Sequence, residues 1–303
     1  MRTRILIFTL VLLSTLSYSQ QDAQYTQYMY NTININPGYA GSRGVMSIFG
    51  LHRTQWVGLD GAPTTNAFSL NSPIENSNLG YGLSFVNDRI GPTVENMISA
   101  DVSYTINTSD TYKLSFGVKA TADLFNLDPS KLNPANQGDP MLQNFNNVFT
   151  PNIGAGVYFH SDKLYLGLSV PNFLETKRYN DNDVAVYSEK INTYLIGGYV
   201  FTISPSLKFK PAFLTKVVQG APLQLDVSGN FLFNDKFMFG AAWRWSAAMS
   251  VMAGFQITEG IYVGYGYDLE TTKLANYNSG SHEIFLRFEL FKYQSRMVSP
   301  RFF

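Results

Sequence analysis

Three histidines, His52, His160 and His282, are the side chains best suited to acid–base or metal chemistry. A metal site needs ligands that converge on one ion, but these three lie far apart along the chain, each in a segment with strand-like patterning. His282 stands between Ser281 and Glu283, which brings a hydroxyl, an imidazole and a carboxylate together in sequence. No surrounding motif marks Ser281 as a nucleophile, so we expect structural histidines and no catalytic residue, metal or cofactor.

Composition excludes several other chemistries. The chain has no cysteine, which rules out thiol catalysis, cysteine-ligated zinc and a disulfide framework. Its 22 Lys and Arg balance 22 Asp and Glu, so there is no basic field that would hold nucleic acid. Neither a phosphate-binding glycine loop nor a calcium loop is present. These absences favour a protein that is not an enzyme.

The first residues have the pattern of an export signal. Arg2 and Arg4 precede the apolar run 5–16, and the small and polar residues 17–20 follow it. The run is too short to span a bilayer as a helix. We therefore expect residues 1–19 to be a signal peptide read by the Sec route.

Apolar and polar residues alternate with period two along most of the remaining chain, which predicts strands. In one stretch the apolar face consists of Ile261, Val263, Tyr265 and Tyr267. The opposite face consists of Tyr262, Gly264, Gly266 and Asp268. A soluble β-sandwich also alternates, but its outer face is usually rich in charge. Here the polar face is mainly Gly, Ser, Asn and Gln, so the pattern favours strands that face lipid.

The repeated pattern predicts an all-β fold: a transmembrane antiparallel β-barrel of about fourteen strands within residues 44–293, in a bacterial outer membrane. The expected strands are 44–54, 64–74, 79–88, 94–107, 111–123, 152–160, 163–170, 190–203, 206–218, 222–233, 236–245, 248–257, 260–269 and 281–293. The longest expected connections, 124–151, 171–189 and 270–280, all fall at one end of such a barrel. We expect this end to face outwards and its loops to contact partners.

Charged neighbours within the strands are expected to pair across strands inside the lumen, because an unpaired charge there is costly. Asp88 with Arg89 and Arg287 with Glu289 are the examples. Residues 20–43, before the barrel, are rich in Tyr, Asn and Gln and could fold into the lumen or lie on the periplasmic rim.

The tail 294–303 is basic and ends in two aromatic residues. It could serve barrel-assembly recognition or bind a periplasmic partner. The candidate contact residues for a partner are Arg296, Arg301, Phe302 and Phe303.

Several short motifs resemble one family when taken together. They include residues 21–31 (QDAQYTQYMYN), 35–42 (INPGYAGS), 53–58 (RTQWVG), 87–91 (NDRIG), 264–268 (GYGYD) and 280–284 (GSHEI). The sequence resembles the PorP/SprF family of Bacteroidota outer-membrane proteins across essentially the whole mature chain. The positions that carry the resemblance are Gln27, Tyr28, Asn31, Asn36, Pro37, Tyr39, Ala40, Gly41, Arg53, Gln55, Trp56, Gly58, Asn87, Asp88, Gly91, Pro171, Tyr267, Asp268, Ser281, His282 and Glu283.

The resemblance implies a non-catalytic component of the type IX secretion system, which in some members is associated with gliding motility. It implies that the barrel serves a large secreted surface protein through that protein's C-terminal domain. The implied partners are outer-membrane lipid, other secretion components and a peptidoglycan-associated periplasmic protein. The barrel alone leaves a passive porin or hydrophobic-solute channel as the alternative.

Overall fold

The computed structural model describes residues 28–131, 145–175, 177–179, 185–188, 190–290, 301 and 303, so the predicted signal peptide lies outside it. The strands are β1 (Met46–Thr54), β2 (Thr64–Pro73), β3 (Leu79–Ile90), β4 (Thr93–Asn107), β5 (Lys113–Leu127), β6 (Phe145–His160), β7 (Leu164–Val170), β8 (Lys177–Tyr179), β9 (Ala185–Ser188), β10 (Asn192–Tyr199), β11 (Phe201–Ser204), β12 (Leu207–Val218), β13 (Gln224–Phe233), β14 (Phe237–Arg244), β15 (Ala248–Thr258), β16 (Ile261–Glu270) and β17 (Ser281–Leu290). The 3-10 helices are η1 (Tyr28–Tyr30), η2 (Thr32–Asn34), η3 (Pro37–Tyr39), η4 (Pro129–Lys131) and η5 (Lys273–Tyr277). No helix in these ranges is long and apolar enough to cross a membrane.

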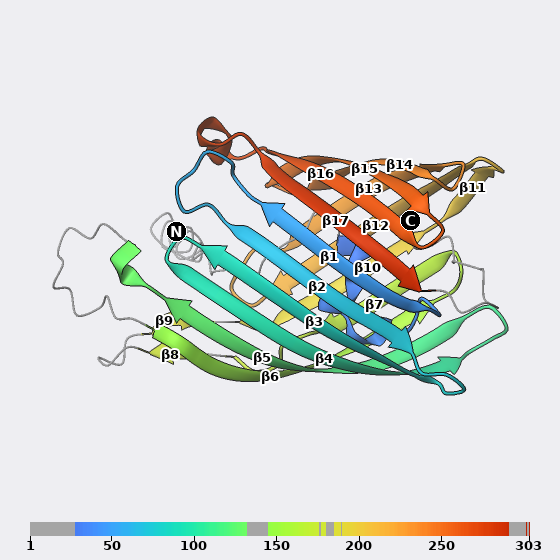
Figure 1. Cartoon of the computed structure of the whole chain (residues 1–303), viewed down its shortest axis with the longest axis horizontal. Helices are drawn as coiled ribbons and strands as arrows, with labels where there is room; N and C mark the ends of the chain where they lie inside the picture. The colour runs from blue at the N-terminus through green and yellow to red at the C-terminus, as the bar shows by residue number, and fades with distance from the viewer. Residues whose placement is uncertain are drawn as a thin grey trace, which may run out of the picture.

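Antiparallel pairing closes the large sheet on itself, as Figure 1 shows. β1 pairs with β2 on one side and with β17 on the other, which joins the two ends of the barrel sequence. Only Val200 separates β10 from β11, and both pair with β12, so they act as one interrupted strand. With these two pieces counted as one, the barrel has fourteen strands, and the predicted fold is confirmed.

The even number of strands gives the barrel two different ends. β1 starts and β17 finishes at the end that carries the tight turns, including 161–163 and 234–236; we call it the short-turn end. The opposite, long-loop end carries the connections 55–63, 171–191 and 271–280. The predicted asymmetry between the two ends is therefore present in the fold.

The connection predicted over residues 124–151 is wrong at both of its ends. β5 continues to Leu127 and β6 already begins at Phe145, with Phe125 opposite Val148 and Ala122 opposite Pro151. Pro151 is unusual inside a strand, because proline cannot donate a ladder hydrogen bond. In the structure β6 meets β7 only from Ala155 onward, so Pro151 lies where β6 has one neighbour and proline is tolerated.

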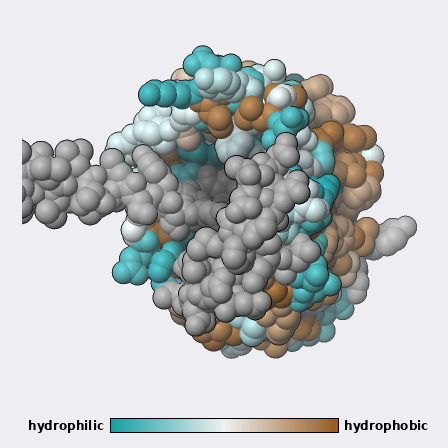
Figure 2. All heavy atoms as spheres, turned by 90° about the vertical axis from the view of Figure 1, so that its left-hand side faces the viewer, coloured by the Kyte–Doolittle hydropathy of each residue, from teal (hydrophilic) through white to brown (hydrophobic). Residues whose placement is uncertain are grey.

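The wall places apolar side chains outside and small or polar side chains inside. On β5, for example, Phe116 and Val118 are 47% and 61% exposed, whereas Ser115 and Lys119, which flank them, are buried. Figure 2 shows brown, hydrophobic residues along the outer side of the wall and teal, hydrophilic residues around its rim. An apolar exterior and a polar interior are typical of a barrel that spans a membrane.

Residues 28–43 form a luminal segment, drawn in dark blue inside the barrel in Figure 1. Its side chains bond to opposite parts of the wall: Tyr30 Oη lies 3.1 Å from Tyr262 Oη on β16, and Asn36 Nδ2 donates to the Val157 carbonyl on β6 over 3.0 Å. Gly117 on β5 allows the close approach, since a Cβ there would overlap the backbone of Pro37 and Gly38. The segment thus crosses the lumen and contacts strands on both sides of it.

Candidate functional site

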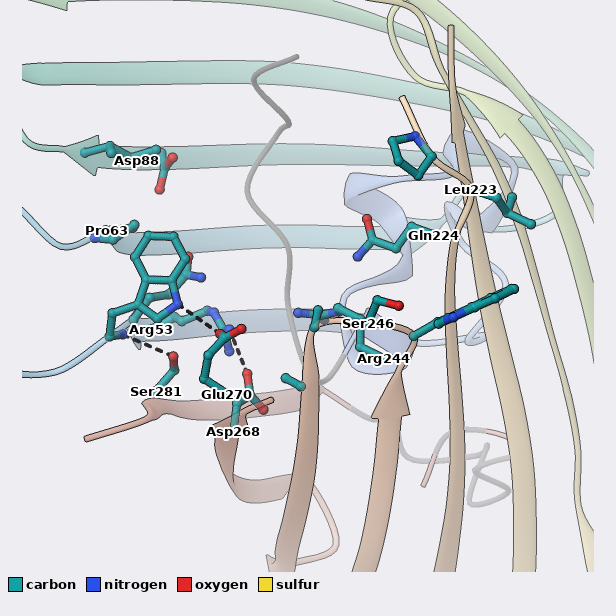
Figure 3. A pocket seen from close by; sticks show the side chains of 17 residues that line it. Arg53, Pro63, Asp88, Leu223, Gln224, Arg244, Ser246, Asp268, Glu270 and Ser281 are labelled. Atoms are coloured by element: carbon teal, nitrogen blue, oxygen red, sulfur yellow. Dashed lines mark hydrogen bonds and ion pairs between the residues drawn. The ribbon is translucent and has the colours of Figure 1, made fainter. Parts of the chain in front are cut away.

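The lumen holds a cavity of about 750 Å³ at the long-loop end, which we call the vestibule (Figure 3). Its lining residues come from the ends of strands that are far apart in sequence. They are Arg53, Gln55, Trp56, Pro63, Asp88, Ile90, Pro222, Leu223, Gln224, Arg244, Trp245, Ser246, Ala247, Ala248, Asp268, Glu270 and Ser281. Barrel closure brings them together, because β1 lies beside β17 and β17 beside β16.

An ion cluster centred on Arg53 forms one side of the vestibule. Its guanidinium donates to Asp268 Oδ2 over 2.7 Å and to Glu283 Oε2 over 3.2 Å. All three residues are buried, and strand register produces the contact, since Arg53 lies directly opposite Glu283. A buried charge needs such partners, so this cluster holds its side chains in fixed positions.

Further hydrogen bonds hold the other polar groups of the vestibule. Arg244 Nε donates to Asp226 Oδ1 over 2.8 Å, and Thr65 Oγ1 donates to Asp88 Oδ1 over 2.6 Å. Trp56 Nε1 donates to Glu270 Oε2 over 3.2 Å, which fixes the indole at the edge of the cavity. The vestibule therefore has a rigid polar interior.

Charge and exposure indicate what this cavity can bind. Its two arginines face five carboxylates, those of Asp88, Asp226, Asp268, Glu270 and Glu283, so negative charge is in excess. Large apolar residues at the mouth are exposed, Trp245 and Leu223 at 52% each and Ile90 at 45%. An apolar rim around a negative interior suits a polypeptide that presents apolar and basic side chains.

The three histidines do not come together. His160 is buried at the short-turn end, whereas His52 and His282 point to the outside of the wall, where they lie 2.8 Å from Asn66 Oδ1 and 2.6 Å from Tyr265 Oη. In the described ranges, no three His, Cys, Asp or Glu side chains are grouped so that they could hold a metal.

Strand alternation also separates the Ser281-His282-Glu283 triplet. Ser281 and Glu283 point inward, so the imidazole between them lies on the other side of the wall. The Ser281 hydroxyl oxygen accepts a hydrogen bond from the Trp56 amide, over 3.2 Å. The triplet is therefore not arranged as a nucleophile with a base.

Alternation corrects one of the two predicted charge pairs. Asp88 is buried in the lumen and accepts a hydrogen bond from Thr65, but Arg89 is exposed on the outside, so the predicted luminal pairing of Arg89 is wrong. Arg287 and Glu289, which are two residues apart and share a face, do meet, with 3.5 Å between Arg287 Nε and Glu289 Oε1.

The positions of the family-like motifs fall into three groups. Those in the vestibule or its ion cluster are Arg53, Gln55, Trp56, Asp88, Asp268, Ser281 and Glu283. Those in the luminal segment are Tyr28, Asn31, Asn36, Pro37, Tyr39, Ala40 and Gly41. The remaining described ones, in loops or on the outside of the wall, are Gly58, Asn87, Gly91, Pro171, Tyr267 and His282. Gln27 lies outside the described ranges, and a functional role for any of these positions stays a prediction.

Tyr30 attaches the luminal segment to the barrel wall. Burial raises the pKa of the Tyr30 phenol well above its usual range, so the hydroxyl stays neutral beside Tyr262. The Tyr30 ring also packs 4.6 Å from Phe285, measured between ring centroids. These contacts bind the luminal segment to β16 and β17.

Of a second polar cluster, at the short-turn end, sequence reasoning predicted only the contact between Arg287 and Glu289. Arg43 donates through Nε to Glu289 Oε1 over 2.6 Å, and Lys210 lies nearby, fully buried. The sequence feature that could have revealed the rest of this cluster is a charged residue at an inward-facing position of an alternating strand. Of the predicted tail contacts, Arg301 and Phe303 are buried in this region, and Arg296 and Phe302 lie outside the described residues.

Solved structures share this architecture. The crystal structure of the Acinetobacter baumannii outer membrane protein Omp33 is 8% identical, with 81% of this chain and 98% of that chain covered and a TM-score of 0.49. The CymD monoaromatic hydrocarbon channel is 11% identical, with 88% and 94% covered and a TM-score of 0.50, a likeness that shows the fold alone. No curated protein sequence matches the chain.

A family match covers most of the sequence. Residues 17–288 match the family described as type IX secretion system membrane protein PorP/SprF. That range includes the luminal segment, every lining residue of the vestibule and all but the last two residues of β17. The chain therefore belongs to the PorP/SprF family of type IX secretion system membrane proteins.

Proposed function

We propose that this outer-membrane component of the type IX secretion system supports the secretion or surface attachment of one cognate large surface protein, without catalysing a reaction. Family membership and the closed barrel give the location and the system. The proposal adds the role: the C-terminal domain of the surface protein docks at the vestibule, with the long-loop end facing outwards. A peptidoglycan-associated protein would contact the short-turn end in the periplasm.

The luminal segment is the observation that carries this proposal. It contacts β2 through Asn31, β5 through Ile33 and β16 through Tyr30, so it is bonded to widely separated parts of the wall. The luminal segment has bulky buried side chains and direct hydrogen bonds to the wall, which suit a docking scaffold better than a pathway for solutes. The vestibule then remains as a recessed surface that is accessible from one end.

The vestibule has properties that support docking. Its apolar rim and negative interior would bind a domain that presents apolar side chains with lysine or arginine among them. The ion cluster of Arg53 keeps the interior rigid before the partner arrives, which reduces the entropy lost on binding.

The test is a deletion strain that is complemented with wild-type or variant genes. We expect deletion to abolish surface display of one large protein while uptake of small hydrophilic solutes stays unchanged. Complementation with the vestibule double variant Trp245→Ser and Leu223→Ser should reduce display although the barrel still assembles. The matched control is Phe237→Ser and Phe239→Ser, on the lipid-exposed face away from the vestibule, scored only if that barrel assembles.

Normal display in the deletion strain would overturn the proposal. A passive porin or hydrophobic-solute channel is the competing function, and purified protein in a planar bilayer separates the two. A docking scaffold should be silent or nearly so, whereas stable open conductance in the wild-type protein would favour the channel.

A further inference from the structure

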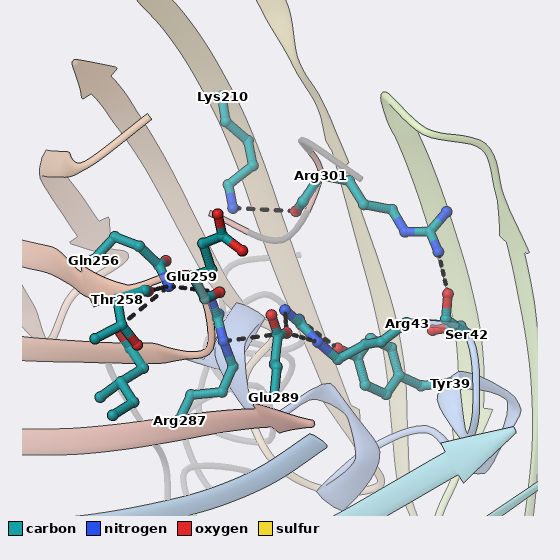
Figure 4. A network of polar contacts seen from close by, with 11 residues as sticks. Tyr39, Ser42, Arg43, Lys210, Gln256, Thr258, Glu259, Arg287, Glu289 and Arg301 are labelled. Atoms are coloured by element: carbon teal, nitrogen blue, oxygen red, sulfur yellow. Dashed lines mark hydrogen bonds and ion pairs between the residues drawn. The ribbon is translucent and has the colours of Figure 1, made fainter. Parts of the chain in front are cut away.

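The short-turn end of the lumen contains a side-chain receptor that neither the docking role nor the family match requires (Figure 4). Arg301 and Phe303, at the end of the sequence, are both only 6% exposed. Their contacts come from the luminal segment, from the turn between β6 and β7, and from β12. Two residues at one end of the chain are thus held by three distant parts of the barrel.

The Arg301 guanidinium is surrounded by acceptors. Nη2 donates to the carbonyl of Ser42, Nη1 donates to the carbonyl of Ser161, and Nη1 lies 2.7 Å from His160 Nδ1. The Arg301 amide also donates to the Asp162 carbonyl over 3.1 Å. Guanidinium has several N–H donors in one plane, and a buried one needs acceptors of this kind.

The aromatic ring of Phe303 occupies a different subsite. Lys210 Nζ lies 4.7 Å from the Phe303 ring centroid and 5.5 Å from that of Tyr30, and it donates to the Arg301 carbonyl over 3.4 Å. Lys210 is 1% exposed, and within the described ranges no carboxylate lies at ion-pair distance from it. A desolvated ammonium between two rings is a favourable site for an aromatic side chain.

The nearby carboxylate of Glu289 interacts with side chains other than Arg301 and Lys210. Glu289 accepts from Arg43 and lies 3.5 Å from Arg287 Nε. The receptor therefore recognises arginine mainly through carbonyl oxygens, and it recognises the aromatic ring through an ammonium. Both subsites are satisfied by an arginine and a phenylalanine that are two residues apart.

We propose that the short-turn end of the lumen is a binding site for a peptide segment with an Arg-x-Phe motif, which Arg301 and Phe303 of the chain itself occupy. Because Ser42 belongs to the luminal segment, occupancy also ties that segment to the β6–β7 turn. Intramolecular binding gains from an effective concentration near the millimolar range, so the same peptide should bind in trans once the receptor is vacated.

The test uses the full chain carrying Arg301→Ala and Phe303→Ala, in detergent. The probe is a fluorescent peptide of residues 297–303, amidated at its C-terminus so that only side chains are read. We expect saturable binding with a Kd below about 0.1 mM, and at least about tenfold weaker binding to the wild-type barrel, where the chain's own residues compete at a millimolar effective concentration. Adding Lys210→Met to the vacated barrel should weaken binding about tenfold.

Three results would overturn the proposal: no saturable binding to a vacated barrel that still migrates as folded, equal binding of a peptide with alanine in place of Arg301 and Phe303, or no effect of Lys210→Met. A second measurement does not need the variant in which both residues are alanine. It uses cysteine labelling, which reports on a single introduced position because the chain has no cysteine. Phe303→Cys should react slowly with a water-soluble maleimide, and adding Arg301→Ala should speed the reaction about tenfold. Equal rates would also contradict the proposal.

Discussion

Arg53 and Glu283 lie opposite each other on β1 and β17, with 3.2 Å between Nη1 and Oε2. β1 is the first strand of the barrel and β17 is the last, so this pair lies across the seam where the two ends of the sheet join. Asp268 on the next strand completes the cluster, 2.7 Å from Arg53 Nη2. The vestibule and the closure of the barrel thus depend on the same guanidinium.

Arg53→Met should strongly destabilise the barrel, because it leaves two buried carboxylates without their cation. We expect a loss of about 3 kcal/mol in the free energy of unfolding, measured by urea titration in lipid vesicles with tryptophan fluorescence. Glu283→Gln should cost less, since Asp268 still pairs with Arg53. Arg89→Met is the matched control: Arg89 is exposed, and a cost within about 0.5 kcal/mol is expected. Similar losses for the two arginine variants would contradict the role of the cluster.

Gly117→Val should displace the luminal segment. A Cβ at Gly117 meets the backbone of Pro37 and Gly38, which cannot move aside as a flexible side chain can. A single cysteine at Asn34, in the otherwise cysteine-free chain, reports the displacement through its rate of maleimide labelling, which should rise about tenfold. Gly50→Val is the control, because nothing lies within 4 Å of a Cβ there. An unchanged rate in the Gly117 variant would show that the segment does not depend on this contact.

The strands could be predicted because each one alternates for about ten residues, and that signal is local. The start of β6 was harder to predict, since Pro151 is tolerated there only because β6 lacks a second neighbour, which sequence does not reveal. Alternation also explains why adjacent motif residues separate, as His282 does from Ser281 and Glu283.

The site itself was less predictable, because its contacts join residues that are more than 200 positions apart. Arg53 meets Asp268, and Arg43 meets Glu289, only because the barrel closes with a particular register. No spacing in the sequence encodes that register. The family-like motifs identified several residues of the vestibule but not that they would share one cavity.

The outward face of β5 should be intolerant of charge. Val118 is 61% exposed on the apolar exterior, so Val118→Arg would place a guanidinium against lipid at a cost of about 2 kcal/mol or more. The measurement is the unfolding free energy in vesicles, with Asp110→Arg in the exposed short turn as the control, where little change is expected. Equal stability of the two variants would contradict a lipid-facing position for Val118.

Trp56 should hold two loops of the long-loop end together. Its backbone lies in the left-handed region, with a φ of 46°, and its indole donates to Glu270 over 3.2 Å. Beside it the Val57 amide donates to the Gly280 carbonyl and the Ser279 amide to the Val57 carbonyl, over 2.9 and 2.7 Å. Trp56→Phe removes the indole hydrogen bond but keeps an aromatic ring.

Losing that bond should cost about 1 kcal/mol locally, so the Val57 and Ser279 amides should exchange with deuterium about fivefold faster. Trp245→Phe is the control, since the exposed Trp245 indole makes no hydrogen bond within the described ranges and these amides should keep their wild-type rates. Faster exchange in both variants would mean that the vestibule rim responds to any loss of indole. Faster exchange in the Trp56 variant alone would show that one indole links the 55–63 and 271–280 loops across the mouth of the vestibule.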